Sequence, residues 1–456
     1  MSATALAGAL RAGHVTAREV AAAHLEAIAR LDATLNAMIT VDAGAANRAA
    51  DALDALPAEE RGPLHGVPVV IKDLTDTRGL RTTYGSALFA DHVPAEDDLV
   101  VARLRAAGAV ILGKSNTPEF GFGALCQNAL CGPTRNPYDP ALTSGGSSGG
   151  SAVAVAAGMA PLAHGTDFGG SLRTPAGFCG VVSIRPTPGR IPSPARGLAW
   201  DTLATHGVMA RSVDDCMLML AAVAGPDRRD PTSLRIPDEP ESGSPRVSAT
   251  VNFGVAPVSR TVRARFDRAL GAMQQALERP VRLGAPDCQG AIASFKTLRA
   301  AHVRHAYGGL RDRFGEGLSP TAAWNIAAGD GLTAQDYLAA EAARSAVSRR
   351  FAAFFEATDV LVAPAASVMP WPNTQADVLE IDGQALDSIV DYLAVTFLVS
   401  LVGYPVLTVP APRGDGETPF GVQLIGRPGA ERTLAALGRR LEAAGFTYRP
   451  PSPEIA

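Results

Sequence analysis

Cysteine is scarce in this chain, and its few cysteines form no recognisable pattern. There are five in 456 residues, an odd number, and no two of them make a C-x-x-C pair. Disulfide-stabilised secreted domains and structural zinc sites both need paired or closely spaced cysteines. We therefore expect a protein of the reducing cytoplasm without a disulfide framework or a metal site, and we predict no cofactor.

A strong net charge is also missing. The 41 basic residues nearly balance the 45 acidic ones, which leaves a net charge of -4. Proteins that bind nucleic acid or an anionic membrane usually carry a broad basic surface. We therefore expect neither of these partners. A small-molecule substrate fits the composition better, and a homo-oligomer is compatible with it.

No segment predicts a signal peptide or a transmembrane helix. Residues 1–30 mix Ala and Leu with Arg, His and Glu and contain no uninterrupted apolar stretch. Residues 392–412 carry no charge and are long enough to cross a bilayer. However, Gly403, Pro405 and Pro410 interrupt them, which indicates a buried helix followed by a short strand.

Helical and strand patterns alternate along the first half of the chain. A T-x-x-E capping box begins at Thr16 and apolar residues follow at helical spacing, so residues 1–60 are predicted to be helical. Short apolar strands at 67–71 and 109–112 then flank a helix at 98–107. Such alternation predicts an α/β fold with a central sheet.

The second half continues the alternation. It contains a predicted long helix at 334–355, strands at 360–362 and 422–425, and a last helix at 432–443. Residues 237–248 are rich in Pro, Ser and Glu, and we interpret them as a surface loop between two halves. Length alone would suggest roughly two to three domains.

Residues 141–166 contain no charged side chain and include six consecutive Gly and Ser residues at 145–150. Such a run is either a flexible linker or buried backbone held close to another group. A predicted helix at 152–157 and a strand at 161–165 follow it directly, whereas a linker would become polar. We therefore interpret the run as buried backbone.

Two short motifs point to other chemistries. Residues 108–115 satisfy G-x-x-x-x-G-K-S, the pattern of nucleotide-binding loops, but the four residues between the glycines are themselves the predicted strand. Residues 145–149 satisfy the G-x-S-x-G nucleophile elbow, which needs a strand immediately upstream. Residues 131–140 contain three prolines and cannot be a central strand. An esterase of the α/β-hydrolase type remains an alternative.

Such an esterase would need a catalytic histidine, and no sequence motif marks any histidine of this chain as catalytic. A chain with eight histidines meets the order Ser, acid, His by chance. We interpret the following four as ordinary core or surface residues: His164, His206, His302 and His305.

Several segments together resemble the amidase signature family. The resemblance covers nearly the whole chain, and its central part, with two glycine-rich serine motifs, is highly specific. The matching segments are Gly145–Ser151, Gly165–Pro175 and Phe178–Pro186, together with Gly66–Asp73, Gly113–Phe120, Gly132–Pro137, Gly403–Pro410 and Gly421–Pro428.

The resemblance implies one amidase domain over residues 1–456, with a mixed central β-sheet flanked by helices on both faces. It implies hydrolysis of a carboxylic amide through an acyl-enzyme on Ser171, with Ser147 as proton bridge and Lys72 as general base. It also places Gly121, Phe122 and Gly123 near the acyl group of the substrate. The residues at Phe168, Ser183, Arg185 and 125–130 differ from those more common in the family. The resemblance therefore does not identify the substrate.

The residues themselves are chemically suited to these roles. Gly169 and Gly170 precede Ser171, so the backbone N–H groups of Phe168 to Ser171 can point at one oxyanion. Lys72 follows an apolar strand, where burial would favour the neutral amine that a base requires. Without the other motifs, however, a solvated ion pair is the favoured interpretation of Lys72 and Asp73, and a glycine pair before a serine is more often a turn.

Two further expectations concern the surroundings of the site. Asp167 and Arg173 are predicted to form a structural salt bridge. Four phenylalanines near the motifs suggest an apolar or aryl substrate group: Phe120, Phe122, Phe168 and Phe178.

The alternative within the family is the glutaminase subunit of a tRNA-dependent amidotransferase. That function would require partner subunits. The segment at 302–307 reads differently from such subunits.

Overall fold

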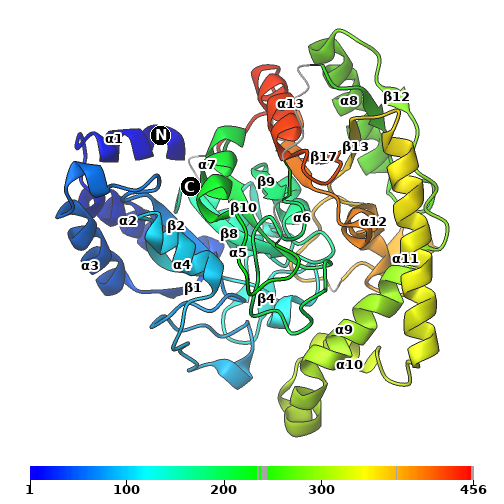
Figure 1. Cartoon of the computed structure of the whole chain (residues 1–456), viewed down its shortest axis with the longest axis horizontal. Coiled ribbons are helices and arrows are strands. Elements are labelled where there is room, and N and C mark those ends of the chain that lie inside the picture. The colour runs from blue at the N-terminus through cyan, green and yellow to red at the C-terminus, as the bar shows by residue number, and fades with distance from the viewer. Residues whose placement is uncertain (234–235, 238–243, 376, 453–456) are drawn as a thin grey trace.

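A single mixed β-sheet runs through the protein (Figure 1). The computed structural model describes residues 1–233, 236–237, 244–375 and 377–452. The strand order is β1-β3-β2-β8-β10-β9-β16-β17-β13-β11-β12. The strands span β1 Met38–Val41, β2 Pro68–Lys72, β3 Val110–Ser115, β8 Leu162–Asp167, β9 Val182–Arg185, β10 Thr205–Ala210, β11 Val247–Ala249, β12 Arg282–Leu283, β13 Val360–Pro364, β16 Val406–Pro410 and β17 Gly421–Gly426.

Both strand directions occur in this sheet. β2 is parallel to β3 and β8, and β11 is parallel to β12 and β13. The other neighbours are antiparallel. Three short two-stranded ribbons lie outside the sheet: β4 Gln127–Asn128 with β5 Gly132–Pro133, β6 Arg135–Asn136 with β7 Asp139–Thr143, and β14 Glu380–Ile381 with β15 Gln384–Ala385.

Helices surround the sheet. They are α1 Ala3–Arg11, α2 Ala17–Leu35, α3 Ala43–Asp54, α4 Leu99–Ala106, α5 Gly149–Ala156, α6 Arg173–Cys179, α7 Val213–Val223, α8 Arg260–Leu277, α9 Ala291–Phe314, α10 Pro320–Ala327, α11 Ala334–Phe355, α12 Ala394–Val402 and α13 Glu431–Ala443. Figure 1 shows α9, α10 and α11 together at the side of the molecule opposite α1 to α3.

Strand β17 shows that helices cover both faces of the sheet, as predicted. A Cβ added at Gly421 would lie 2.6 Å from Gly177 of α6, whereas one added at Gly426 would lie 3.2 Å from a methyl group of Leu434 in α13. Residues separated by an odd number of positions on a strand face opposite sides. α6 and α13 therefore cover opposite faces.

The prediction of an entirely helical segment over residues 1–60 is wrong at β1. The capping box at Thr16 forms, but α2 ends at Leu35, and the C-cap residue Asn36 has a left-handed backbone (φ 53°). The following Met38–Val41 then pairs antiparallel with β3. These residues are apolar or β-branched and suit a strand. A run of four is too short to stand out beside two helices.

The predicted loop at 237–248 is wrong at its end. Residues 238–243 lie outside the described residues. Val247 and Ser248, however, are buried in β11 and pair in parallel with β13. The Pro, Ser and Glu content of the segment hid a strand of only three residues.

Most other predicted elements are confirmed. The helix at 334–355 is α11, the strands at 360–362 and 422–425 lie within β13 and β17, and the helix at 432–443 is α13. Residues 392–412 contain α12 followed by β16. Within the described residues, no helix is both long and apolar enough to cross a membrane.

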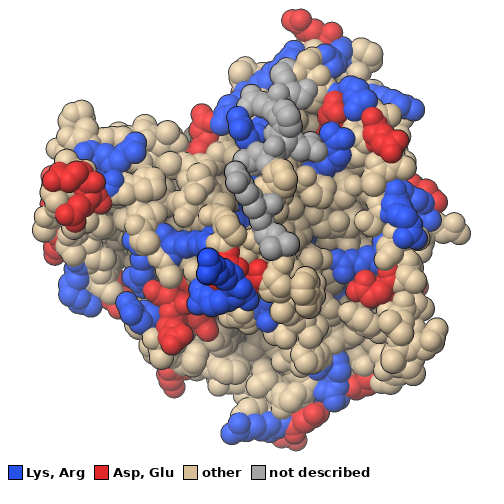
Figure 2. Space-filling model, viewed as in Figure 1, with Lys and Arg blue, Asp and Glu red and all other residues tan. Residues whose placement is uncertain are grey.

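Charged side chains of both signs are interspersed on the face of the molecule shown in Figure 2. Many of the exposed charges are paired, for example Arg246 with Asp359 at 2.8 Å and Arg439 with Asp214 at 2.6 Å. This mixing agrees with the small net charge of the sequence.

Candidate active site

Lys72 is the last residue of β2, and its side chain is completely buried. Its Nζ donates to Ser147 Oγ at 2.6 Å and to Thr166 Oγ1 at 2.9 Å. β2 runs parallel to β8, with Ile71 beside His164, and this register brings Thr166 next to the lysine. The two strands therefore hold the amine against a serine hydroxyl.

Burial lowers the pKa of Lys72 from its usual value near 10.5 to about 7, although the nearby Cys126 and Asp167 act in the opposite direction. Near neutral pH a large fraction of this amine is therefore unprotonated and able to accept a proton. Asp73 is buried as well, and its carboxylate accepts hydrogen bonds from the Thr83 N–H at 3.0 Å and from the Thr83 hydroxyl at 2.5 Å. The alternative of a solvated Lys72–Asp73 pair is therefore wrong.

The Gly- and Ser-rich run at 145–150 is buried backbone, as predicted. A Cβ added at Gly150 would lie 2.4 Å from Ala37 O and from Asn116 N, so the chain passes too close for a side chain there. α5 starts within the run, at Gly149, and Ser147 lies just before it. The backbone of this segment holds the Ser147 hydroxyl against Lys72.

The segment upstream of this run forms the ribbons β4–β5 and β6–β7, which lie outside the main sheet. No strand of the central sheet leads into Ser147, so the geometry of a nucleophile elbow is missing from this described part of the chain. The rejected nucleotide-binding motif is likewise part of the sheet, because β3 runs from Val110 through Lys114 to Ser115.

Ser171 lies in the loop that joins β8 to α6. Gly170 has φ +127°, and a Cβ there would lie 2.3 Å from Thr396 Oγ1, so only glycine fits. The Thr396 hydroxyl donates to Gly169 O at 2.6 Å and fixes the loop from the side of α12. Ser171 itself is half-buried and faces a cavity.

One of the predicted oxyanion donors has another acceptor. The Gly170 N–H donates to Asp167 Oδ1 at 2.9 Å, and the Leu172 N–H donates to Asp167 Oδ2 at 3.0 Å. The prediction that Gly170 supplies a free donor is therefore wrong in this structure. The carboxylate instead uses that N–H to shape the loop around Ser171.

Asp167 and Arg173 form the predicted structural salt bridge at 2.8 Å, and both side chains are fully buried. Arg185 joins them at 3.3 Å, a contact that the sequence did not reveal. Burial alone would raise the pKa of Asp167, but Arg173 and Arg185 hold it well below its usual value. The group stays ionised and keeps its hydrogen bonds to the loop.

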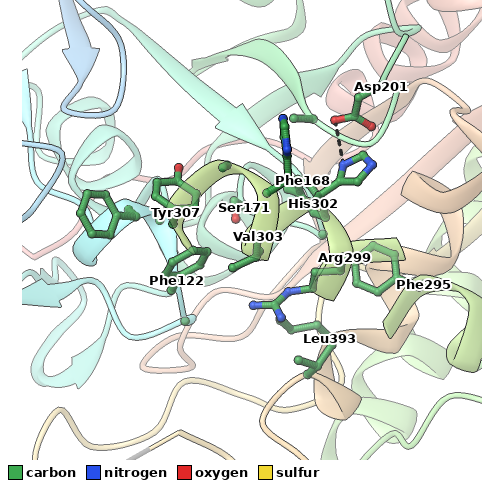
Figure 3. A pocket seen from close by; sticks show the side chains of 18 of the residues that line it. Phe122, Phe168, Ser171, Asp201, Phe295, Arg299, His302, Val303, Tyr307 and Leu393 are labelled. Atoms are coloured by element: carbon green, nitrogen blue, oxygen red, sulfur yellow. Dashed lines mark ion pairs between the residues drawn. The ribbon is translucent and has the colours of Figure 1, made fainter. Parts of the chain in front are cut away.

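A cavity of about 560 Å³ opens in front of Ser171 (Figure 3). Its wall includes the predicted Gly121, Phe122 and Gly123 and the backbone at 168–170. A Cβ added at Gly121 would lie 3.3 Å from Ser147 Oγ, so this wall reaches the buried serine as well. The cavity thus brings the predicted substrate-binding residues together with both serines.

Of the four phenylalanines named from the sequence, three lie at the cavity wall. Phe120, Phe122 and Phe168 line the cavity. Phe178 does not, because its ring packs edge-on against Trp371 at 6.0 Å in a separate cluster.

Helix α9 supplies a cavity wall that the sequence did not reveal. The wall residues from this helix include Phe295, Arg299, His302, Val303, His305 and Tyr307. His302 Nδ1 lies 3.4 Å from a carboxylate oxygen of Asp201, as the dashed line in Figure 3 marks. His302 is half-buried and His305 is exposed, which agrees with their interpretation as ordinary residues, although both lie at the cavity wall.

The other two histidines lie away from the cavity. His164 and His206 are core residues as predicted, with their rings hydrogen-bonded at 3.0 Å. Their burial agrees with the interpretation made from the sequence.

Comparison with known proteins identifies relatives over the full chain. The Amidase family profile matches residues 19–435. The A subunit of glutamyl-tRNA(Gln) amidotransferase from Burkholderia pseudomallei (strain 668) is 36% identical over 474 aligned positions, which cover 93% of each chain.

Solved structures of other proteins also resemble this chain over nearly its full length. A bacterial aryl acylamidase of the amidase signature enzymes family superposes with a TM-score of 0.88 at 26% identity, covering 100% of this chain and 97% of that one. The peptide amidase from Stenotrophomonas maltophilia superposes with a TM-score of 0.83 at 26% identity, covering 99% and 98%.

Proposed function

Because the chain belongs to the Amidase family and is an enzyme that acts on amides, we propose that it cleaves the C–N bond through an acyl-enzyme on Ser171. In this proposal Ser147 is the proton bridge and Lys72 is the general base. The observation that carries it is the 2.6 Å hydrogen bond between Lys72 Nζ and Ser147 Oγ, buried behind the cavity that Ser171 lines. A serine hydroxyl becomes a good nucleophile only when a neighbouring base takes its proton.

In the first step, Ser171 Oγ attacks the amide carbonyl carbon and passes its proton to Ser147, which passes its own proton to neutral Lys72. The carbonyl electron pair moves onto oxygen. The carbonyl then re-forms from the oxyanion as the C–N bond breaks, the proton returns through Ser147 to the amide nitrogen, and the amine leaves an ester on Ser171. In the second step, water attacks the ester carbonyl carbon and passes a proton through Ser147 to Lys72. The carbonyl then re-forms as the C–O bond to Ser171 breaks, Ser171 Oγ regains the proton by the same path, and the carboxylic acid leaves.

Thr166 has a supporting role in this proposal. Its hydroxyl accepts a Lys72 hydrogen at 2.9 Å and so orients the amine, and in the neutral amine the lone pair takes the place of the N–H that Ser147 Oγ accepts in this structure. The backbone N–H groups of Phe168, Gly169 and Ser171 are the proposed oxyanion donors, since the Gly170 N–H is bonded to Asp167.

A fluorophosphonate probe tests the proposal directly. We expect one phosphonyl adduct by intact mass and, after proteolysis, the adduct on the peptide that contains Ser171. An adduct on Ser147 with Ser171 unmodified would contradict the assigned nucleophile and revive the elbow mechanism.

Ser147→Ala is expected to lower kcat by about 10²- to 10³-fold, because it removes the proton bridge and leaves the nucleophile in place. The matched control is Ser144→Ala, which also deletes a buried hydroxyl from the same segment, one that donates to Thr134 O at 3.2 Å. Equal rates for the two variants would remove Ser147 from the mechanism.

A second candidate function is the glutaminase reaction of an amidotransferase component. The observation in its favour is the 36% identity to such proteins across 93% of both chains. It requires L-glutamine as substrate and partner subunits. Hydrolysis of L-glutamine in preference to aryl amides, together with stoichiometric co-purification of other chains, would favour it over a free-standing amidase.

A further inference from the structure

Arg299 is a cation in the wall of the cavity that Ser171 lines. Figure 3 shows its side chain leaving α9 on the side of Phe122 and Leu393. The guanidinium donates to Asn325 Oδ1 and lies 6.0 Å from the centre of the Phe122 ring. Burial lowers the pKa of Arg299 to about 10, so the group is still protonated at neutral pH.

The other partly buried cations near Arg299 have acidic partners. On the same helix, Lys296 lies 2.5 Å from Asp391, and Arg304 lies 3.1 Å from Asp330. Among the described residues, no carboxylate lies within 4.0 Å of the Arg299 guanidinium. Asn325 is its neutral partner instead.

The carboxylate in the cavity wall is already engaged. Asp201 lies 3.4 Å from His302 and accepts the Leu203 N–H at 2.8 Å. Arg196, the other wall cation, lies 3.8 Å from Asp230. Arg299 is therefore the arginine of the cavity wall that has no oppositely charged partner among the described residues.

Arg299 is partly buried. A partly desolvated cation without a counter-ion is costly, and a ligand anion would offset that cost. The planar guanidinium matches a carboxylate with two parallel hydrogen bonds. The remaining wall is largely apolar and aromatic, with Phe122, Phe168, Phe295 and Leu393 around the charge. A ligand that fits both features combines a carboxylate with an aryl or alkyl body.

We infer that the substrate of this enzyme is an amide that carries a carboxylate, and that Arg299 binds this carboxylate. The inference rests on the proposed function for the identity of the reacting serine, but the preference for an anion is a property of the cavity alone. It can therefore be measured in binding as well as in turnover.

Two matched pairs of amides test the inference and locate the carboxylate. Succinanilic acid and butananilide differ by the exchange of a carboxylate for a methyl group on the acyl side. 4-Acetamidobenzoate and 4-acetamidotoluene differ by a carboxylate on the amine side. We expect one of the two acids to show a kcat/KM higher than its neutral counterpart by roughly 10- to 100-fold, the value of a hydrogen-bonded charge pair.

Arg299→Met should abolish this preference, measured as the ratio of kcat/KM for the acid to that for its neutral counterpart. Arg299→Lys keeps the charge but not the planar fork, so it should restore part of the ratio. The matched control is Arg313→Met, an exposed arginine of the same helix outside the cavity, which should keep both the ratio and the activity. A structural role for Arg299 would lower turnover of acid and neutral amide alike and leave the ratio unchanged.

Calorimetric binding to Ser171→Ala separates this inference from the proposed mechanism. Tighter binding of an acid than of its neutral counterpart, lost in the Ser171→Ala, Arg299→Met double variant, supports the inference even if the wild-type enzyme turns over neither probe. Equal binding of acid and neutral amide, or no binding of either acid, overturns it. Turnover of neutral amides together with that result would leave the proposed mechanism intact.

Discussion

Ser171→Ala is expected to lower kcat by roughly 10⁶-fold, the loss seen when the nucleophile of a serine hydrolase is removed. The variant lacks the oxygen that forms the acyl-enzyme, so the remaining cavity can only bind the amide and polarise its carbonyl. Because Ser171 is half-buried and the loop is held by Asp167 and Thr396, the fold should be unaffected. Single-turnover kinetics with an aryl amide, alongside thermal unfolding, measure both quantities.

The fluorophosphonate adduct should disappear in the same variant. A folded Ser171→Ala protein that retains its rate within tenfold would show that another group attacks the substrate. Loss of the rate together with a lowered unfolding temperature would instead indicate that the loop had collapsed, so thermal unfolding separates loss of the nucleophile from loss of structure.

Lys72→Arg is expected to lower kcat by about 10⁴-fold, the upper end of general acid–base catalysis. Arginine preserves the positive charge and much of the stem but does not give up its proton at accessible pH. A structural cation would survive this exchange, whereas a base would not. The measurement is kcat at pH 8 on protein that circular dichroism shows to be folded.

Lys114 provides a matched control for this exchange. It is a second fully buried lysine, and it donates to Thr77 Oγ1 at 3.1 Å and to Thr82 Oγ1 at 2.9 Å. It does not line the cavity. Folded Lys114→Arg should therefore keep its activity. If both exchanges lowered the rate equally, the loss would come from the larger buried guanidinium and not from a missing base.

The pH profile of the wild-type enzyme follows from the same lysine. Burial holds the pKa of Lys72 at about 7, so the neutral base is scarce below that pH and predominates above it. The rate should rise about tenfold per pH unit below pH 7 and level off above it. In Lys72→Arg this rise should vanish. A plateau that begins only near the ordinary lysine value would show that the amine is not desolvated in the working enzyme.

The proposed catalytic residues could be picked out from the sequence because they lie inside or beside local motifs. Ser147 and Ser171 each sit where backbone must approach closely, and glycine marks such places in a sequence. Lys72 follows a buried β-branched strand, which predicted its desolvation. These signals are local, and the fold only needs to bring them together.

The rest of the site was not predictable because no local pattern marks it. Arg299 and His302 come from an ordinary helix more than a hundred residues after Ser171, and they face the cavity only because α9 packs beside the nucleophile loop. The engagement of the Gly170 N–H by Asp167 depends on side-chain geometry that no spacing reveals. β1 and β11 are short, and they exist as strands only because a neighbour pairs with them.

The buried hydrogen bonds of Arg173, next to the loop that carries Ser171, join segments that are far apart in the sequence. Arg173 Nη1 donates to Thr396 O at 2.6 Å and to Gln423 Oε1 at 2.8 Å, partners that lie 223 and 250 residues further along. A chain that already contains Lys72, Ser147 and Ser171 but not yet α12 and β17 lacks these contacts. The geometry of the loop around Ser171 therefore depends on α12 and β17, and a chain truncated before Thr396 lacks both of these contacts.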